Sequence, residues 1–275
     1  MILLPTFDNS RPMIERLTPI QFDRLASTGR TGPAFITCED VAGDTIEVVA
    51  KLSARCNLGC TSLAIEVLSA CVAADLGLPV PRPYLVPMDP DWLDAVSDAD
   101  WEATARKGSP LAFASRRVQT GFSTWVTGTT LLGDMVQTAA GILLFDAISD
   151  NPDRRDSNPN CLVRGDELRI IDHELCFSPV ILFGWRPPWQ IGALHPMERP
   201  GAHIFRAPLM RQVIDWDPIK TAWMGLSDAD FAGYQAAIPP EWAEALPAVN
   251  SAIEKVRNAR DNIDACVVEM QRVLT

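Results

Sequence analysis

Two aspartates and one asparagine in the middle of the chain have the residue types and the spacing of a metal-dependent phosphoryl-transfer site. Asp153 and Asn158 lie on one polar stretch, and Asp172 follows across a short predicted hairpin. Carboxylate and amide oxygens are hard ligands that suit Mg²⁺ bridging nucleotide phosphates. A further aspartate nearby can accept the proton of an attacking hydroxyl, or orient that hydroxyl. The pattern therefore indicates metal ligands beside one positioned carboxylate.

Lys51 is the candidate cation for the phosphates. It ends the β-branched run Val48-Val-Ala-Lys51, and a strand would hold a lysine rigidly against a nucleotide. Glu66 lies on the next predicted helix, where it would pair with Lys51 like the ion pair that fixes the equivalent lysine in kinases.

A flexible loop is expected at 27–33, because this segment is made of small residues, glycine and proline. Placed over the phosphates, the loop would offer backbone N–H groups, with Gly29, Arg30 and Thr31 in contact with the nucleotide. On its other side the nucleotide would lie against the predicted strand 112–116, at Ser115.

Each of these residues also has a structural interpretation. Aspartate and asparagine are common in turns, so Asp153 and Asn158 by themselves also fit an Asx-turn. Lys51 also fits an edge-strand charge that faces water. Glu66 also fits a surface residue that flanks a buried helix face. Because Lys51 precedes the Asp153 loop and Asp172 follows it, as a phosphoryl-transfer site requires, we favour the functional interpretation.

The elements that would position these side chains begin with a β-hairpin. Two β-branched runs, 34–39 and 45–51, are separated by a turn at Gly43-Asp44. A helix capped by Thr61 or Ser62 and ended by Gly77 with Pro79 should follow. Its predicted buried face consists of Leu63, Val67, Ala70, Cys71 and Ala74, with Glu66 at the edge. An edge strand through 84–88 and a strand over 112–118 would complete a β-rich region.

The second half of the chain is predicted to be mostly helical. A buried helix over 133–149 leads into the polar loop, and a hairpin with a turn at Gly165-Asp166 follows. We expect one helix to begin at the Ser227–Asp230 capping box and another to run from about 247 to 274. The acidic segment 89–107 fits a solvated insert, with a short helix capped by Ser97, better than a partner-binding patch.

Composition narrows the possible partners. The chain has 275 residues and a formal net charge of −11. Because nucleic acids and anionic membranes are polyanions, both are unfavourable partners for it. No apolar run approaches the roughly 20 residues needed to cross a bilayer. The seven cysteines show no zinc-binding spacing, so we expect reduced thiols and a cytoplasmic location. Neither a Walker A sequence nor a Gly-x-Ser-x-Gly elbow occurs, which disfavours P-loop kinases and serine hydrolases.

Several motifs resemble the short branch of the HipA-like kinases. The loop Asn151-Pro-Asp-Arg-Arg-Asp-Ser-Asn-Pro-Asn160 and Ile171-Asp-His173 look like the catalytic segments of this family. Gly29-Arg-Thr-Gly-Pro33, Leu76-Gly-Leu-Pro-Val-Pro81 and Ile238-Pro-Pro-Glu-Trp242 match further motifs of the branch. The catalytic segments are also similar to those of phosphoinositide kinases. The resemblance spans nearly the whole chain.

The resemblance implies an α+β, two-lobed, protein-kinase-like fold, with a β-rich N-lobe over 1–115 and a mostly helical C-lobe over 116–275. It implies that Asp153 is the catalytic aspartate, that Asn158 and Asp172 bind Mg²⁺, and that Lys51 contacts the phosphates of ATP. The residues after the metal ligand read Asp172-His-Glu, which departs from eukaryotic-type kinases.

The implied activity is transfer of the γ-phosphoryl group to a Ser or Thr hydroxyl, with a protein as the expected acceptor. Two alternatives stay open. One is a lipid or small-molecule kinase, and the other is a non-catalytic, nucleotide-binding module. The chain is short for the extra N-terminal subdomain of HipA toxins, so the toxin role and an antitoxin-like regulator are also left open.

Overall fold

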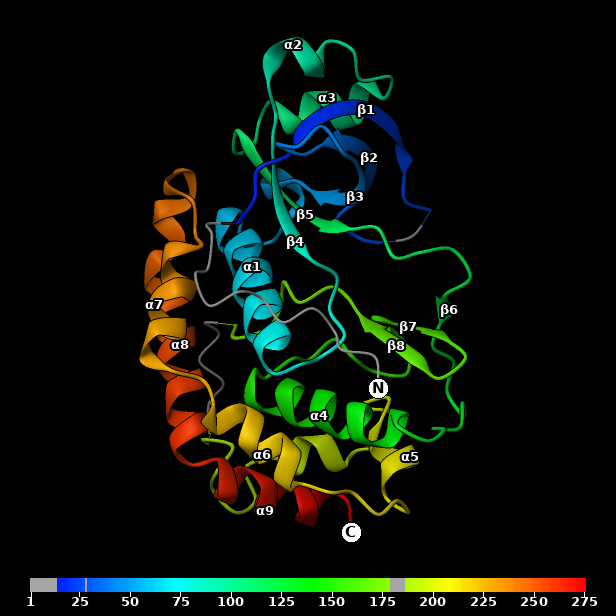
Figure 1. The fold of residues 1–275 in the computed structure, drawn as a ribbon, viewed down its shortest axis with the longest axis vertical. Helices are drawn as coiled ribbons and strands as arrows, with labels where there is room; N and C mark the ends of the chain where they lie inside the picture. Colours follow the sequence, from blue (N-terminus) through cyan, green and yellow to red (C-terminus); the bar gives the residue numbers. More distant parts are fainter. Residues whose placement is uncertain (1–13, 28, 179–185) are drawn as a thin grey trace.

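A five-stranded antiparallel sheet forms the upper part of the molecule (Figure 1). The structure, a computed structural model, describes residues 14–27, 29–178 and 186–275. The sheet order is β1-β2-β3-β5-β4. The strands are β1 (Thr18–Leu25), β2 (Ala34–Glu39), β3 (Thr45–Lys51), β4 (Pro83–Pro87) and β5 (Leu111–Arg116). The predicted β2–β3 hairpin, the β4 edge strand and the β5 strand are therefore confirmed.

Strand β1 was not anticipated from the sequence. Its eight residues are mostly exposed, so they lack the alternation of apolar and polar side chains that marks a half-buried strand. It pairs with β2 through a register that shifts twice. Backbone pairing with a neighbouring strand, rather than its own side-chain pattern, makes this segment a strand.

Helix α1 (Cys60–Asp75) carries Glu66 below the sheet. Gly59 occupies the N-cap position and no side chain caps the helix, so the predicted cap at Thr61 or Ser62 was wrong. Gly77 follows the helix with a φ of 71°, as expected for a helix end.

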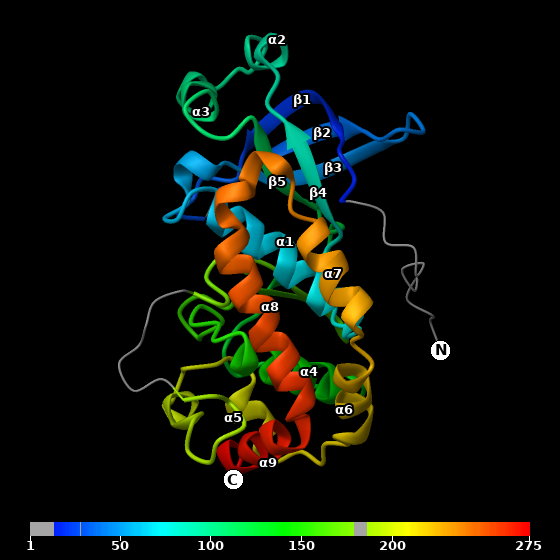
Figure 2. The same ribbon diagram turned by 90° about the vertical axis from the view of Figure 1, so that its left-hand side faces the viewer.

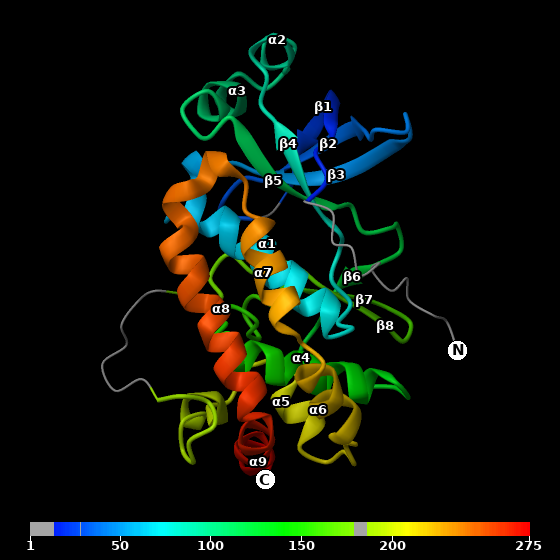
Figure 3. The same cartoon turned by 60° about the vertical axis from the view of Figure 1, so that its left-hand side comes forward.

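The prediction of one buried face on α1 was too narrow, because most of its residues are buried, Glu66 included. The helix packs against β4 and β5 on one side. On the other side it contacts α7 (Asp228–Ala236), α8 (Leu246–Asp261) and the 3-10 helix η3 (Pro240–Ala245). Figures 2 and 3 show α7 and α8 running alongside it.

Helices form the lower part of the molecule. Besides α7 and α8 they are α4 (Met135–Ile148), α5 (Arg206–Leu209), α6 (Asp217–Met224), α9 (Ile263–Val273) and the 3-10 helix η2 (His195–Glu198). The buried helix predicted over 133–149 corresponds to α4, and the Ser227–Asp230 capping box is present at the start of α7.

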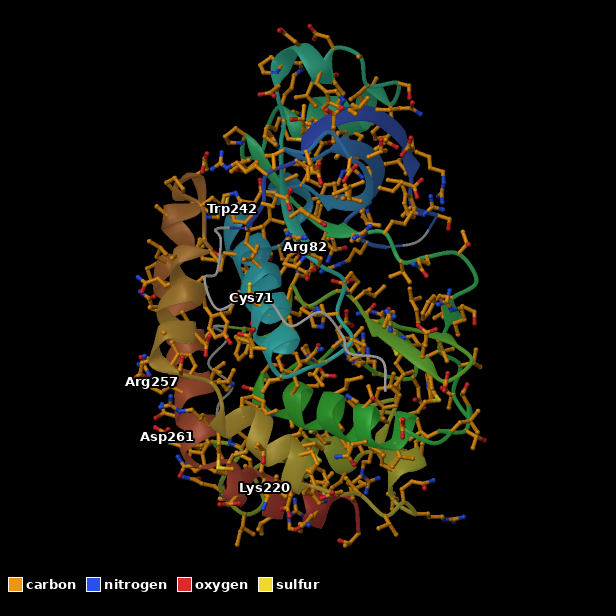
Figure 4. All side chains as sticks on the ribbon, viewed as in Figure 1. Cys71, Arg82, Lys220, Trp242, Arg257 and Asp261 are labelled. Atoms are coloured by element: carbon orange, nitrogen blue, oxygen red, sulfur yellow. The ribbon has the colours of Figure 1, made fainter. Side chains whose placement is uncertain are left out.

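The single helix predicted from about 247 to 274 was wrong, because the chain bends at Asn262. This residue has a φ of −121°, and its side-chain amide donates to the carbonyl oxygen of Asn258 at 2.8 Å. The bend separates α8 from α9 and lets α9 pack against α4 and α6. An ion pair between Lys220, labelled in Figure 4, and Asp264 joins α6 to α9.

Two smaller units complete the fold. Strands β6 (Ser123–Thr124), β7 (Cys161–Arg164) and β8 (Glu167–Ile170) form a second antiparallel sheet, which confirms the predicted β7–β8 hairpin. The 3-10 helix η1 (Ser53–Arg55) precedes α1, and the acidic insert forms α2 (Pro90–Leu93) and α3 (Ala99–Ala105). The cap of α3 is Asp98, which accepts from the backbone N–H of Trp101, and not Ser97 as predicted.

The fold is α+β, with a β-rich N-terminal region and a helical C-terminal region, as the sequence indicated. One hydrophobic cluster lies within the five-stranded sheet and around α3. A larger cluster joins α1 to the C-terminal helices. The division into lobes at residue 115 stays a prediction. Within the described residues, no helix is both long and apolar enough to cross a membrane.

Candidate functional site

A cavity of about 850 Å³ lies between the five-stranded sheet and the β7–β8 hairpin. Its walls come from the loop before β2, from β2, β3, α1 and β5, and from the segments on either side of the hairpin. All of the predicted site residues line it: Gly29, Arg30, Thr31, Lys51, Glu66, Ser115, Asp153, Asn158 and Asp172. Residues up to 143 positions apart in the sequence therefore share one cavity.

Lys51 is surrounded by three carboxylates. Its Nζ forms an ion pair with Glu66 Oε1, lies 2.6 Å from Asp172 Oδ1 and lies 3.6 Å from Glu174 Oε2. Lys51 is 7% exposed and Glu66 is 2% exposed, so neither faces water as the alternative interpretations required. Strand β3 and helix α1 hold the pair from two directions, which leaves it little freedom.

Burial and ion pairing act in opposite directions on this cluster. Burial disfavours the ammonium, but Glu66, Asp172 and Glu174 outweigh it and raise the pKa of Lys51. Burial raises the pKa of Glu66 despite its partner. Burial also disfavours the Asp172 carboxylate, but Lys51 more than offsets this and lowers the pKa of Asp172. Lys51 therefore stays charged, and Asp172 is ionised and available as a ligand.

Asp153 is held by two asparagines. Its Oδ2 accepts hydrogen bonds from the side-chain amides of Asn158 at 2.8 Å and Asn160 at 3.3 Å. Its backbone N–H donates to the side-chain oxygen of Asn151 at 3.0 Å. The side chain is still 19% exposed, at the cavity wall. The loop thus fixes the orientation of a carboxylate that a bound molecule can reach.

Asn160 is a site residue that the sequence reasoning missed. A second asparagine after Asn158, next to a proline, was the available signal, but it does not distinguish a turn residue from a side chain aimed at Asp153. Glu174 was missed for a similar reason: its type is common, and only the fold brings it to Lys51.

Backbone strain is concentrated in this region. Four described residues other than glycine have positive φ: Asp150, Asn160, Asp172 and Phe177. Aspartate and asparagine tolerate this conformation, whereas in Phe177 it costs about 1–2 kcal/mol. Strain of this kind persists only where surrounding contacts impose it, and such contacts occur at functional sites. Two of the four, Asn160 and Asp172, line the cavity.

The loop before β2 is held over the cavity by its own contacts. Arg30 Nη2 lies 3.8 Å from Glu174 Oε1. When the Asn57 amide oxygen is turned toward the loop, it accepts a hydrogen bond from Arg30 at 3.1 Å. Gly32 has a φ of 54°, a conformation that glycine adopts without strain, and the end of the Arg55 side chain lies against it.

Arg154 and Asp146 form the buried base of the Asp153 loop. Arg154 Nε donates to Asp146 Oδ2 at 2.6 Å, and both side chains are fully buried. Burial opposes the charge of Asp146, but Arg154 and then His203 outweigh it and hold the pKa of this carboxyl well below its usual range. Asp146 also accepts from Asn151 at 2.7 Å. Asp146 thus has a structural role, because it binds the loop that follows α4.

Comparison with known proteins identifies the family. A family model described as HipA-like kinase matches residues 23–187, which is more than half of the chain. Curated proteins give no match. The matched range includes Lys51, Glu66, Asp153, Asn158 and Asp172, the residues that the fold brings to one cavity. The chain therefore belongs to the HipA-like kinase family, and its enzyme class is that of a phosphotransferase.

Proposed function

We propose that this protein is an ATP- and Mg²⁺-dependent kinase that transfers the γ-phosphoryl group to a Ser or Thr hydroxyl on a protein. The observation that carries the proposal is the meeting of Lys51, Asp153, Asn158 and Asp172 in one cavity. Phosphoryl transfer depends on positioning and on charge stabilisation, and these four residues supply a cation, a positioned carboxylate and two oxygen ligands.

The nucleotide fits the cavity by size and by the character of its walls. A volume of about 850 Å³ lies within the range of small-molecule sites. Phe35 and Val49 line the cavity from the sheet, and Leu162 and Ile170 line it from the hairpin side. Apolar side chains on two sides favour a flat purine ring between them. The triphosphate would then extend toward Lys51 and the loop 29–33.

The residues present fit a magnesium ion. The Asn158 side-chain nitrogen is engaged by Asp153, so its oxygen remains as a ligand. The Asp172 carboxylate is 31% exposed and lies at the cavity wall. Both offer hard oxygen atoms, which Mg²⁺ prefers. When bound, the ion would neutralise and orient the phosphates. The cluster of Glu66, Asp172 and Glu174 is a weaker candidate, because Lys51 Nζ already lies among its carboxylates.

In the reaction, Asp153 would orient the acceptor hydroxyl and take its proton. The acceptor oxygen would form a bond to the γ-phosphorus while the bond from that phosphorus to the β–γ bridging oxygen breaks, and ADP would leave. Asn158 and Asn160 would keep the Asp153 carboxylate in its reactive orientation. Lys51 would hold the phosphates in line, in a position fixed by Glu66.

A protein acceptor is favoured over a membrane lipid by charge. The net charge of −11 opposes approach to an anionic membrane surface. A non-catalytic nucleotide-binding module is less favoured, because all four residues expected of an active kinase are present and line one cavity: Lys51, Asp153, Asn158 and Asp172. A cytoplasmic location is part of the proposal, since the structure joins none of the seven cysteines, all of which it describes, in a disulfide bond.

The experiment compares Asp153→Asn with Asp156→Asn, an exposed aspartate on the same loop. Each variant is incubated with Mg-ATP and with protein extracts, and transfer of the labelled γ-phosphate to protein is measured. We expect Asp153→Asn to lower transfer by about a hundredfold or more, because the acceptor loses its general base. Asp156→Asn should retain transfer. Normal transfer by Asp153→Asn would refute the assignment, and label recovered in lipid would support the lipid-kinase alternative.

A further inference from the structure

The segment 199–205 packs against the Asp153 loop, although it follows the end of the family match at residue 187. Gly201 accepts a hydrogen bond from the backbone N–H of Asp156 at 3.2 Å. The backbone N–H of Ile204 donates to the carbonyl oxygen of Arg154 at 3.2 Å. Two backbone bonds from this segment thus hold the residues that directly follow Asp153.

His203 lies at the centre of this contact and is 4% exposed. Its Nδ1 accepts from the backbone N–H of Phe205 at 3.1 Å, and its Nε2 lies 2.9 Å from Asp146 Oδ2. A backbone N–H can only donate, so Nδ1 carries no proton and Nε2 does. His203 is therefore the tautomer that donates to Asp146.

Asp146 links His203 to Arg154. The same carboxylate oxygen that accepts from His203 also accepts from Arg154 Nε, at 2.6 Å. The Arg154 guanidinium then reaches the carbonyl oxygens of Asn160 and Ile171, and lies 3.1 Å from His173 Nε2. One buried side chain therefore connects the loop that carries Asp153 with the segment that carries Asp172.

We infer that His203 is a positioning residue for phosphoryl transfer, and this inference rests on the proposed function. Its hydrogen bond to Asp146 holds the orientation of the carboxylate, which sets the position of Arg154. Arg154 in turn fixes the spacing between the Asp153 carboxylate and the Asp172 metal ligand. Within the described residues, the apolar walls of the cavity and the loop 29–33, which would hold the nucleotide, form no hydrogen bond or ion pair with His203, Asp146 or Arg154, so we expect the larger effect on the chemical step.

Two variants separate the two hydrogen bonds of His203. In His203→Gln the side-chain amide nitrogen takes the place of Nε2 and can donate to Asp146, while the acceptor for Phe205 is lost. In His203→Asn the shorter amide takes the place of Nδ1 and can accept from Phe205, but it does not reach Asp146. The two variants differ by one methylene group and have the same polar group.

The test measures kcat and the KM for ATP in both variants. We expect His203→Asn to lower kcat by about tenfold to a hundredfold, the size of loss expected from a misplaced reacting group. Its KM for ATP should change less than its kcat, because the apolar cavity walls and the loop 29–33 keep their contacts. His203→Gln should keep kcat within about threefold of the unchanged protein. The control is His195→Asn, whose histidine side chain is 77% exposed in the same part of the chain.

The inference is overturned if folded His203→Asn has normal kcat, if it raises KM without lowering kcat, or if folded His203→Gln loses as much kcat as His203→Asn. It is also overturned if His203→Gln is impaired and His203→Asn is not, since the Phe205 bond would then be the important one. Thermal melting shows which variants fold. If His203→Asn does not fold, the kcat of His203→Gln decides alone.

Hydrogen exchange separates failure of this inference from failure of the proposed function. If the unchanged protein transfers no phosphate, the proposed function fails whatever His203 does. The amide of Asp156, bonded to Gly201, still reports on the loop. Faster exchange there in His203→Asn, but not in His203→Gln, supports positioning by the Asp146 bond. Equal exchange in both variants contradicts it.

Discussion

At the scale of single residues, Lys51 enters the site with its charge already neutralised. Three carboxylates lie within 3.6 Å of its Nζ, and Asp153 adds another negative charge to the same cavity. A triphosphate therefore needs positive charge in addition to that of Lys51. Arg155 is well placed to supply it, because its Nη2 lies 3.8 Å from Asp153 Oδ1 and its side chain is 54% exposed at the cavity.

We predict that Arg155→Met lowers kcat/KM for phosphoryl transfer by about a hundredfold, because the transferred group loses a cation that stabilises its charge. Steady-state kinetics with ATP measures this. Arg211→Met, at an exposed arginine just beyond α5, is the matched control and should leave kcat/KM unchanged. An Arg155→Met enzyme as active as that control would show that the metal and the loop N–H groups suffice.

The buried histidine His203 should make stability depend on pH. Burial lowers the pKa of His203, because the charged imidazolium loses its hydration. In the unfolded chain its pKa returns to about 6.5, so below that pH the unfolded state binds a proton that the folded state does not. The stabilisation that the neutral His203 gives the folded state is fully present above about pH 6.5. As the pH falls below this value, the free energy of unfolding drops by up to about 1.4 kcal/mol per pH unit.

Urea unfolding at several pH values between 5 and 7.5 would measure this dependence. The free energy of unfolding should fall more steeply toward low pH in the unchanged protein than in His203→Gln, which has no titrating group at that position. Identical slopes would mean that His203 titrates equally in both states, which its burial argues against.

At the scale of elements, α1 is held from outside the sheet by the C-terminal helices. The hydroxyl of Tyr234 on α7 donates to Asp75 Oδ2 on α1 at 2.7 Å, and η3, which carries Trp242, packs against α1. Figure 4 places Trp242 near the upper end of α1, on which Cys71 is labelled. This packing keeps Glu66 at Lys51, and a swing of α1 would disrupt the larger hydrophobic cluster.

Removing the Trp242 side chain should therefore weaken the whole fold. We predict that Trp242→Ala lowers the free energy of unfolding by about 3–5 kcal/mol, because it empties a fully buried position. Denaturant titration measures the change. Trp92→Ala, at a half-buried tryptophan of the acidic insert, should cost less. Equal losses would contradict the larger contribution expected from the fully buried Trp242 side chain.

Elements with a strong local pattern were predicted well. Turn residues and β-branched runs identified β2–β3 and β7–β8, a capping box identified the start of α7, and continuous apolar residues identified α4. The missed features lack a local signal. Strand β1 is mostly exposed, Gly59 caps α1 without a side chain, and the bend at Asn262 serves the packing of α9.

At the scale of the whole molecule, the site residues come from two regions that Lys51 joins through Asp172 and Glu174, and that the nucleotide and its metal would join further. We predict that Mg-ATP at a hundred times its Kd stabilises the protein by about 2.7 kcal/mol, since it binds the folded state alone. Thermal melting with and without Mg²⁺ measures this. Asp172→Asn should lose most of the Mg²⁺-dependent part, whereas Asp166→Asn, in the exposed β7–β8 turn, should keep it. Equal melting shifts would exclude Asp172 as a metal ligand.

The sequence alone determined the order of the chemical groups along the chain and the local elements that carry them. Residue types, turn formers and apolar periodicity are local properties, so they are sufficient to propose Lys51, Asp153, Asn158 and Asp172 as site residues. Tertiary structure decided which other residues join them. Glu174 at Lys51 and His203 at Asp146 are contacts set by the packing of distant segments. No pattern within one segment encodes them, because their partners lie on other elements.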